Sequence, residues 1–198
     1  MSIFIDRINE FKNKNFKDVE EKYKSLAQSQ KPHTLLVTCS DSRLCPHEFS
    51  LAGAGELFII RNAGNLVPSF SAGNPSNEAV TLEYGVVALG IKEVVVCGHI
   101  SCGAMTAVQN TEGLDSLPLV KTALTHYKNE NRNEIEECDN LDELIEWNVK
   151  NQLASLLSYE FIKTRVKKGE LSLSGIVYDF VNAEVTFETK VQKDGAVM

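Results

Sequence analysis

Two short apolar runs, each followed directly by a residue that can ligate a metal, most constrain how this chain can fold. Cys39 follows residues 34–38, and His99 follows residues 94–98. Apolar runs of this length are typical of buried strands. In an open parallel sheet, ligands bind outside the carboxyl ends of the strands. We therefore expect the two side chains to meet at one edge of a parallel sheet.

A third candidate ligand, Cys102, lies three residues after His99, so both fall on the same side of a turn or of a first helical turn. Two thiolates and one imidazole form a ligand set for zinc that leaves one coordination position for solvent, whereas a structural site is closed by four protein ligands. The sequence thus predicts a catalytic site with one Zn2+ per chain, held by Cys39, His99 and Cys102.

The composition indicates one α/β domain over residues 1–198, with residues 1–29 as an N-terminal helical arm. The chain is 43% hydrophobic and carries 27 acidic against 20 basic residues, a formal charge of −7. This charge argues against nucleic acid as a partner, since such binding requires clustered Lys and Arg. The N-terminus does not resemble a secretory signal, and no apolar stretch is long enough to span a membrane. Five cysteines favour metal binding or free thiols over disulfides, so we expect a cytoplasmic protein.

The hydrophobic periodicity predicts a mixed order of helices and strands. In the first half of the chain we expect one or two amphipathic helices ending near Gln28, strands at 34–38, 56–60 and 93–97, a short helix after Pro46, a loop at 65–77 and a helix over 79–89 capped by Ser76. In the second half we expect a helix at 103–108, surface helices between 110 and 142, and a long helix from 141 to about 166 ended by Gly169. Two strands at 173–180 and 185–189 then follow, with a turn near Asn182 between them.

Cys39 opens the pentapeptide Cys-Ser-Asp-Ser-Arg, which adds Asp41 and Arg43 to the candidate site. A carboxylate beside a zinc-bound hydroxide can accept its hydrogen bond, and a guanidinium can hold that carboxylate bidentately and keep it ionised. The alternative is that Asp41 caps a helix while Arg43 forms a surface ion pair.

These motifs together resemble the β-class carbonic anhydrases. The resemblance covers the pentapeptide at 39–43, the segment 99–103 (His-Ile-Ser-Cys-Gly), 61–65 (Arg-Asn-Ala-Gly-Asn), 83–84 and 178–180. It implies a mainly parallel four-stranded sheet flanked by helices, with a C-terminal strand extension. It also implies zinc on Cys39, His99 and Cys102, and reversible hydration of CO2 to bicarbonate and a proton by zinc-bound hydroxide.

The resemblance also implies a subgroup and a substrate pocket. Gln30 matches the glutamine that contacts the substrate oxygen in the plant-like group, whose fourth zinc position is open, and Leu36 stands where the other group carries tryptophan. The residues implied to bind CO2 or bicarbonate are Gln30, Gly103, Phe58, Ala63 and Tyr84. The family forms homodimers or homotetramers in which the partner subunit supplies part of each pocket.

Two other functions remain open at this stage. The same zinc site could hydrolyse carbonyl sulfide or carbon disulfide, which are close to CO2 in shape. A noncatalytic zinc-stabilised module that binds bicarbonate is disfavoured, because a structural site needs no carboxylate beside an open position.

Several other residues carry weaker signals. His33, His47 and His126 have the chemistry of proton shuttles, but none is assigned. Cys97 is expected in the core, and Cys45 and Cys138 are not expected to be ligands. Arg61 is compatible with a bicarbonate contact or with an interface or structural ion pair. Gly53 and Gly55 begin a dinucleotide-binding pattern, but Phe58 occupies the third glycine position.

Overall fold

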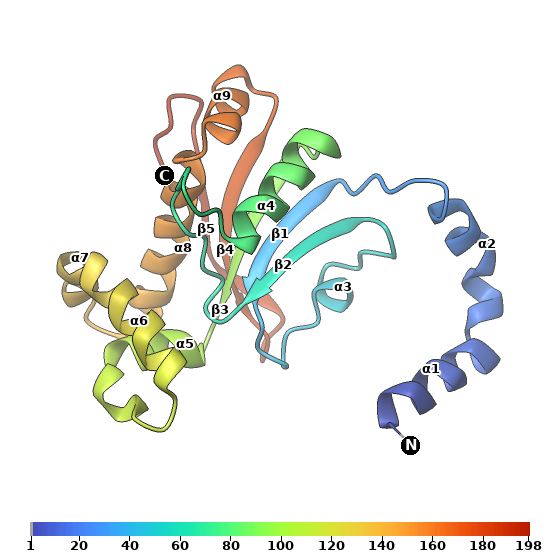
Figure 1. Cartoon of the computed structure of the whole chain (residues 1–198), viewed down its shortest axis with the longest axis horizontal. Helices are drawn as coiled ribbons and strands as arrows, with labels where there is room; N and C mark the ends of the chain where they lie inside the picture. Colours follow the sequence, from blue (N-terminus) through green and yellow to red (C-terminus); the bar gives the residue numbers. More distant parts are fainter. Residues whose placement is uncertain (1) are drawn as a thin grey trace.

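The computed structural model describes residues 2–198 (Figure 1). Its elements are α1 (Ile3–Lys14), α2 (Phe16–Leu26), β1 (Thr34–Cys39), α3 (Pro46–Phe49), β2 (Leu57–Asn62), α4 (Asn77–Glu83), the π-helical turn η1 (Tyr84–Ala88), β3 (Glu93–His99), α5 (Gly103–Gln109), the 3-10 turn η2 (Thr111–Leu114), α6 (Pro118–Glu130), α7 (Arg132–Glu136), α8 (Leu141–Leu157), α9 (Glu160–Lys168), β4 (Ser172–Asp179) and β5 (Glu184–Lys190).

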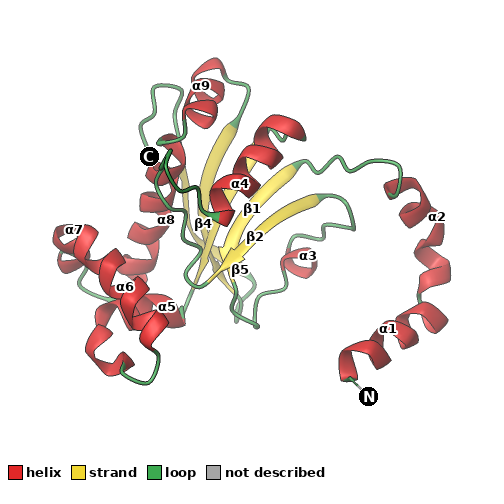
Figure 2. Ribbon diagram, viewed as in Figure 1, coloured by secondary structure: helices red, strands yellow, loops and turns green. Residues whose placement is uncertain are grey.

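The strands form one sheet in the order β2-β1-β3-β4-β5 (Figure 2). The first four strands are parallel, and β5 runs antiparallel to β4. The predicted α/β class with a mainly parallel sheet is therefore confirmed, and the expected C-terminal extension is a fifth strand of the same sheet. The strand order reverses at β1, which has β2 on one side and β3 on the other. Such a switch point opens a crevice at the carboxyl ends of the two central strands.

The central strands are buried along nearly their whole length. Every residue of β1 is buried, and Leu35, Val37, Val94 and Val96 are completely inaccessible. Continuous apolar runs of this kind belong to parallel strands covered on both faces. The predicted strand positions are confirmed, but β1 and β3 extend further than expected. Cys39 and His99 are thus the last residues of their strands, not the first residues beyond them.

Capping residues in the sequence correctly predicted the start of one helix and the end of another. The Ser76 side chain accepts the Ala79 amide at 3.1 Å, as the predicted cap requires. Gly169 ends α9 in the left-handed conformation, with φ 72°. The turn near Asn182 is also present, because the Asp179 carboxylate accepts the backbone amides of Val181 and Asn182.

The single long helix predicted over 141–166 was wrong. The chain leaves the helical conformation at Tyr159, which is extended (φ −83°, ψ 115°) and separates α8 from α9. The Tyr159 side chain is buried, and its hydroxyl donates to the Pro68 carbonyl at 2.6 Å. The break is therefore stabilised by a contact with a distant loop, which periodicity alone does not reveal.

The predicted helix over 79–89 also changes form along its length. It begins as α4 and widens into η1, where the Leu89 amide bonds to the Tyr84 carbonyl five residues earlier. Gly85 lies in this widened turn, and a Cβ there would come within 2.8 Å of Leu35 on β1. The turn thus brings the backbone directly onto the sheet.

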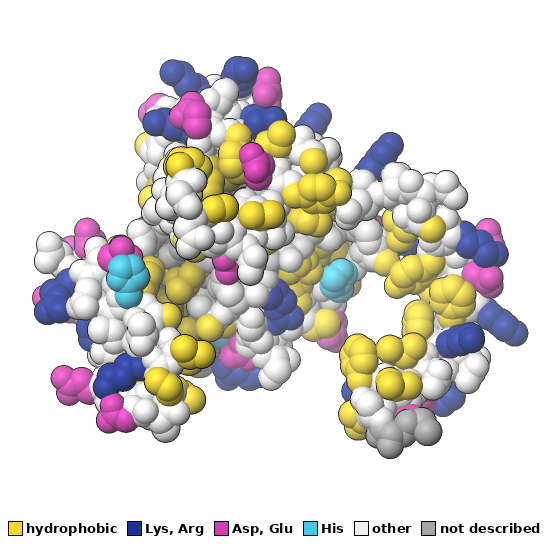
Figure 3. Space-filling view, viewed as in Figure 1, with side chains coloured by type: hydrophobic (Ala, Val, Ile, Leu, Met, Phe, Trp, Pro, Cys, Tyr) yellow, Lys and Arg dark blue, Asp and Glu magenta, His cyan; other side chains and the backbone are white. Residues whose placement is uncertain are grey.

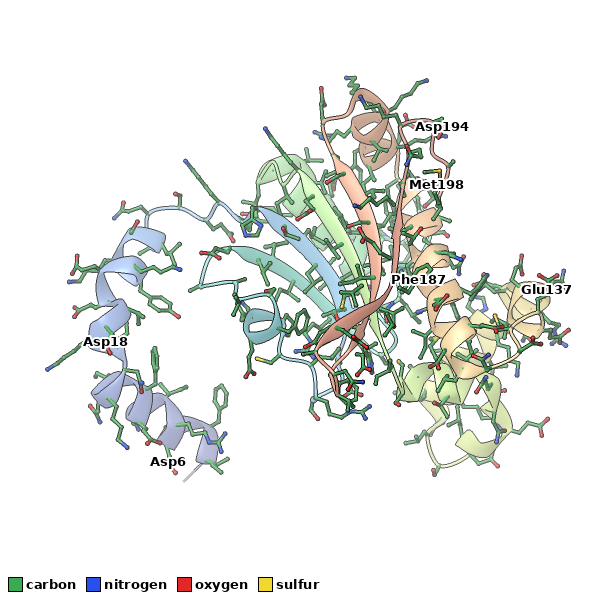
Figure 4. All side chains as sticks on the ribbon, turned by 180° about the vertical axis from the view of Figure 1, so that it is seen from behind. Asp6, Asp18, Glu137, Phe187, Asp194 and Met198 are labelled. Atoms are coloured by element: carbon green, nitrogen blue, oxygen red, sulfur yellow. The ribbon has the colours of Figure 1, made fainter. Side chains whose placement is uncertain are left out.

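The N-terminal arm consists of two helices, as expected, and neither contains a buried residue. The arm extends away from the sheet, as the positions of Asp6 and Asp18 show from behind (Figure 4). Its hydrophobic side chains gather on the side that faces the rest of the molecule (Figure 3). Ile3 and Phe4 are each 72% exposed, so this apolar surface is not covered within one chain. Within residues 2–198, no helix is both long and apolar enough to cross a membrane.

Helix α8 lies close against β3 and β4 because two strand positions lack side chains. A Cβ at Gly175 would lie 2.4 Å from Val149 Cγ1, and one at Gly98 would lie 2.8 Å from Val149 Cγ2. Both distances are shorter than any real contact of a Cβ atom. The position of α8 relative to the sheet therefore depends on glycine at these two sites.

We expect Gly175→Ala to lower the free energy of unfolding by about 1–3 kcal/mol, since the added methyl overpacks a closed contact. Gly73→Ala, in a loop where a Cβ meets nothing within 4 Å, serves as the control and should change it by less than about 0.5 kcal/mol. Urea denaturation measures both. Combining Gly175→Ala with Val149→Ala should recover part of the loss, and strictly additive losses would contradict the explanation.

Candidate metal centre and active site

The three predicted ligands converge at the switch point of the sheet. Cys39 ends β1, His99 ends β3, and Cys102 is the residue immediately before α5. Their ligand atoms all lie within 4.8 Å of one another, and the side chains are buried, with exposed fractions of 5%, 0% and 1%. Residues sixty positions apart in the sequence thus form one compact donor set.

The imidazole of His99 is oriented for a ligand that is not part of the chain. Its Nδ1 donates to the Ile100 carbonyl at 2.8 Å, which leaves a lone pair on Nε2. This Nε2 is buried and has no hydrogen-bond partner. A buried polar atom without a partner is costly, and here the atom faces two sulfurs. The donor set and this free nitrogen fit a tetrahedral zinc ion with three protein ligands.

Backbone amides support negative charge on both sulfurs. The nearby backbone amides of Gly64 and Asp41 act to lower the pKa of Cys39, and those of Ala104 and Met105 in α5 act to lower the pKa of Cys102. The two sulfurs also share a hydrogen bond, which is the largest cause of a lowered pKa at Cys39 and of a raised pKa at Cys102. Thiols must lose their protons to ligate a metal, so a cation bound between these sulfurs would take the place of protons.

Asp41 and Arg43 form a bidentate pair beside this group. Arg43 Nε donates to Asp41 Oδ1 at 2.9 Å, and Nη2 donates to Oδ2 at 2.7 Å. The Arg43 amide also donates to Oδ1 at 3.0 Å, and no helix begins here because α3 starts only at Pro46. Hydrogen bonds from the Arg43 side chain are the main reason that the pKa of Asp41 lies well below its usual range. Asp41 Oδ2 lies 3.9 Å from His99 Nε2.

Arg43 is itself held from two further directions. Its Nη2 donates to the Ser101 carbonyl at 3.1 Å, and its guanidinium lies 4.5 Å from the centre of the Phe180 ring. Ser101 has φ 53°, so the segment between His99 and Cys102 contains a left-handed turn. The sequence placed Phe180 in a motif but gave no sign of this stacking contact, which depends on where β4 ends.

Arg61, for which two roles remained open, directs its guanidinium at backbone oxygens. Nε donates to the Cys39 carbonyl at 3.0 Å, and Nη2 donates to the carbonyls of Asp41 and Leu44 at 2.9 and 3.4 Å. One side chain on β2 thus holds the loop that carries the first ligand and its neighbouring carboxylate. A single sequence carries no signal for such contacts, because the acceptors are main-chain atoms.

The predicted pocket residues fall into two groups at opposite ends of the strands. Ala63 directly follows the end of β2, and Gly103 directly follows Cys102, so both lie at the metal end. Phe58 pairs with Leu35 near the start of β1, and its ring lies 6.1 Å from that of Tyr84. Leu35, the partner of Phe58, lies four positions before Cys39 along β1, which corresponds to a distance of about 13 Å. Gln30 precedes β1 altogether, so the chain does not bring this second group to its own ligands.

The other histidines and cysteines lie outside the ligand set. His33 precedes β1, His47 lies in α3, and His126 lies on α6, where its Nε2 is 3.2 Å from Glu130. Cys97 is completely buried in β3, as predicted, and burial raises its pKa to about 12. The two remaining cysteines, Cys45 and Cys138, are exposed and partly exposed free thiols.

Comparisons with known proteins agree with this geometry. The family model described as carbonic anhydrase matches residues 34–185. A carbonic anhydrase of Pseudomonas aeruginosa is 37% identical over 93% of this chain and 86% of its own length, and one of Synechococcus elongatus is 35% identical over 98% and 74%. The solved structure of the β-carbonic anhydrase CcaA superposes with a TM-score of 0.84 at 32% identity, covering 95% of this chain and 86% of its own. The chain therefore belongs to the carbonic anhydrase family, in its β class.

Proposed function

We propose that this protein catalyses the reversible hydration of CO2 to bicarbonate and a proton, with zinc held by Cys39, His99 and Cys102. The observation that carries the proposal is the buried, unpartnered Nε2 of His99 facing two sulfurs, with an ionised carboxylate beside it. Zinc in such a site supplies a Lewis acid that lowers the pKa of water from 15.7 to about 7, so that hydroxide is available near neutral pH.

Asp41 has the position and charge state to orient the attacking oxygen. An ionised carboxylate can only accept hydrogen bonds, so it holds the O–H of water or bicarbonate and directs the lone pair at carbon. Both of its oxygens are already bonded to Arg43, and moving onto a metal would break these contacts. This supports the plant-like group, in which the fourth ligand position stays open.

The substrate requires an apolar cavity with donors at one end. Ala63 and Gly103 lie beside the ligands, and the position of a Cβ at Gly103 meets nothing within 4 Å, which leaves room for a small molecule. We assign the Gly103 amide and the Gln30 side chain to the oxygen that becomes negative. Phe58 and Tyr84 would then form the apolar wall.

These assignments require a second copy of the chain, because Gln30, Phe58 and Tyr84 lie at the far end of β1 from their own ligands. The chain exposes apolar surface that a second copy could cover. Val80, Tyr84 and Val87 on α4 and η1 are 46–56% exposed, and the N-terminal arm exposes its own apolar side. We infer a homodimer, alone or within a homotetramer, in which each chain completes the pocket of its partner.

The direct test is stopped-flow CO2 hydration on protein whose zinc content has been measured. We expect one zinc per chain and turnover well above buffer, with carbonyl sulfide a poorer substrate than CO2. Cys102→Ser should lose zinc and turnover together, because two ligands remain. Cys45→Ser, at an exposed cysteine outside the ligand set, is the control and should keep both. A clear preference for carbonyl sulfide, or hydration by zinc-free protein, would overturn the proposal.

Asp41→Asn separates orientation from metal binding. All three ligands remain, so the zinc content should not change, whereas turnover should fall by about 100-fold or more because the amide cannot replace the accepting carboxylate. The matched control is Asp115→Asn, at an exposed carboxylate paired with Lys121, which should leave turnover unaltered. Full activity in Asp41→Asn would remove the role assigned to this residue.

Subunit complementation tests the shared pocket. Gln30→Ala and Asp41→Asn should each be nearly inactive alone. When the two are co-expressed in equal amounts, half of the dimers are mixed and one of their two sites is intact, so about a quarter of wild-type activity should return. If Gln30 served its own chain, the mixture would stay as inactive as its components.

A further inference from the structure

A cavity of about 670 Å³ lies between the end of α8, helix α9 and the turn near the end of the chain. Three lysines line this lysine cavity: Lys163 and Lys167 on α9, and Lys193 on the turn. Figure 4 shows Asp194, the next residue of the turn, beside α9. The cavity includes none of the residues of the candidate metal centre, so it is a separate feature of the fold.

The needs of the helix itself do not explain the lysines of α9. Cations stabilise the last turn of a helix through its dipole, which accounts for Lys167. Lys163 lies at the end of the first turn, where the dipole favours negative charge, and like charges four positions apart repel each other. Within residues 2–198, no ion pair joins Lys163, Lys167 or Lys193 to a carboxylate. The positive charge of the cavity therefore has no counterion in the described chain.

Two glycines bring Lys193 close to α9. Gly195 has φ 93°, and its amide donates to the Gln192 carbonyl at 2.9 Å, which closes the turn that carries the lysine. Gly169 ends α9, and a Cβ there would lie 3.2 Å from Lys193 Nζ. The Lys193 side chain thus crosses the bare end of the helix, where any larger residue would crowd it.

The charge and the apolar lining of the cavity define what it can bind. Three ammonium groups and the single carboxylate of Asp194 give its lining a net charge of +2, in a chain whose formal charge is −7. Lysine binds phosphate as a point charge, and a phosphate monoester carries about −1.5 to −2 at neutral pH. Ala154, Leu157 and Val166 add apolar surface to the same cavity. Its lining therefore matches an anion of two charges that has an apolar part.

We propose that the lysine cavity binds a phosphate monoester with an apolar body, of the class of the nucleoside monophosphates. The phosphate is held by Lys163, Lys167 and Lys193, and the body lies against the apolar side chains of α8 and α9. The volume of the cavity falls within the range of about 300–1,000 Å³ that is typical of small-molecule sites. Bicarbonate fits poorly, because it carries one charge and has no apolar part. The site needs neither zinc nor the metal centre, so it is independent of the proposed function.

Isothermal titration calorimetry of the full chain with adenosine monophosphate (AMP), inorganic phosphate and adenosine tests the site. In about 0.15 M salt, AMP should bind with a Kd below about 1 mM. Inorganic phosphate should bind at least about 10-fold more weakly because it buries no apolar surface, and adenosine should bind more weakly still because it has no charge. The proposal fails if AMP does not bind, or if either of the other two compounds binds as tightly as AMP.

Charge variants on α9 locate the phosphate. Lys163→Gln and Lys167→Gln change exposed residues and keep a good helix former, so the fold should be retained. Each should weaken AMP binding about 3- to 5-fold, and the double variant about 10-fold or more. Lys168→Gln is the matched control, since it removes the same charge from the next position of α9 but does not line the cavity, and it should change the Kd by less than about 2-fold. An equal loss in Lys168→Gln and Lys163→Gln would reduce the effect to the overall charge of the helix and refute the site.

Two further variants act on the cavity in opposite directions. Asp194→Asn removes its one negative charge and keeps an oxygen that can accept the Ala196 amide, so AMP should bind more tightly. Ala154→Gln places a larger neutral side chain in the cavity from an exposed position of α8, so AMP binding should be lost while the melting temperature changes by less than about 2 °C. Unchanged AMP affinity in both variants would place the ligand elsewhere and contradict the assignment.

Discussion

The free lone pair of His99 Nε2 is the point on which the rest of this structure depends. It exists because the other ring nitrogen is bonded to the backbone at Ile100, and it is aimed at two sulfurs because the sheet order reverses at β1. Parallel strands end at a common edge, so a switch point brings the last residues of β1 and β3 together without any special loop. The buried donor set is thus a consequence of the strand order.

Around this donor set, many of the hydrogen bonds that hold the loops in place are accepted by main-chain carbonyls. Arg61 bonds to three carbonyls of the loop between Cys39 and Leu44, and Arg43 bonds to the carbonyl of Ser101. Arg43 therefore links the loop after β1 to the turn after β3. The carboxylate of Asp41 lies between these two segments, and its ionised state follows from the fixed guanidinium rather than from exposure to water.

Features that depend on local chemistry were predictable from the sequence. The ligand positions follow from apolar runs that end in Cys39 and His99, and the helix ends at Ser76 and Gly169 follow from capping rules. The break at Tyr159 did not follow, because it depends on a loop 91 residues earlier in the chain. For the same reason, nothing in the sequence placed Phe180 under Arg43 or directed Arg61 to backbone oxygens, since these contacts form only once the strands are aligned.

The proposed sharing of tasks between the two ends of β1 would restrict how this strand can vary. Its last residue belongs to the candidate metal centre, and the segment before its first residue carries the glutamine that we propose serves a neighbouring copy. Side chains along a strand alternate between faces, so inserting or deleting one residue would turn Cys39 toward the wrong side of the sheet and shift Gln30 along it. Length polymorphism should therefore be excluded from this strand in natural variants, even where one apolar residue replaces another freely.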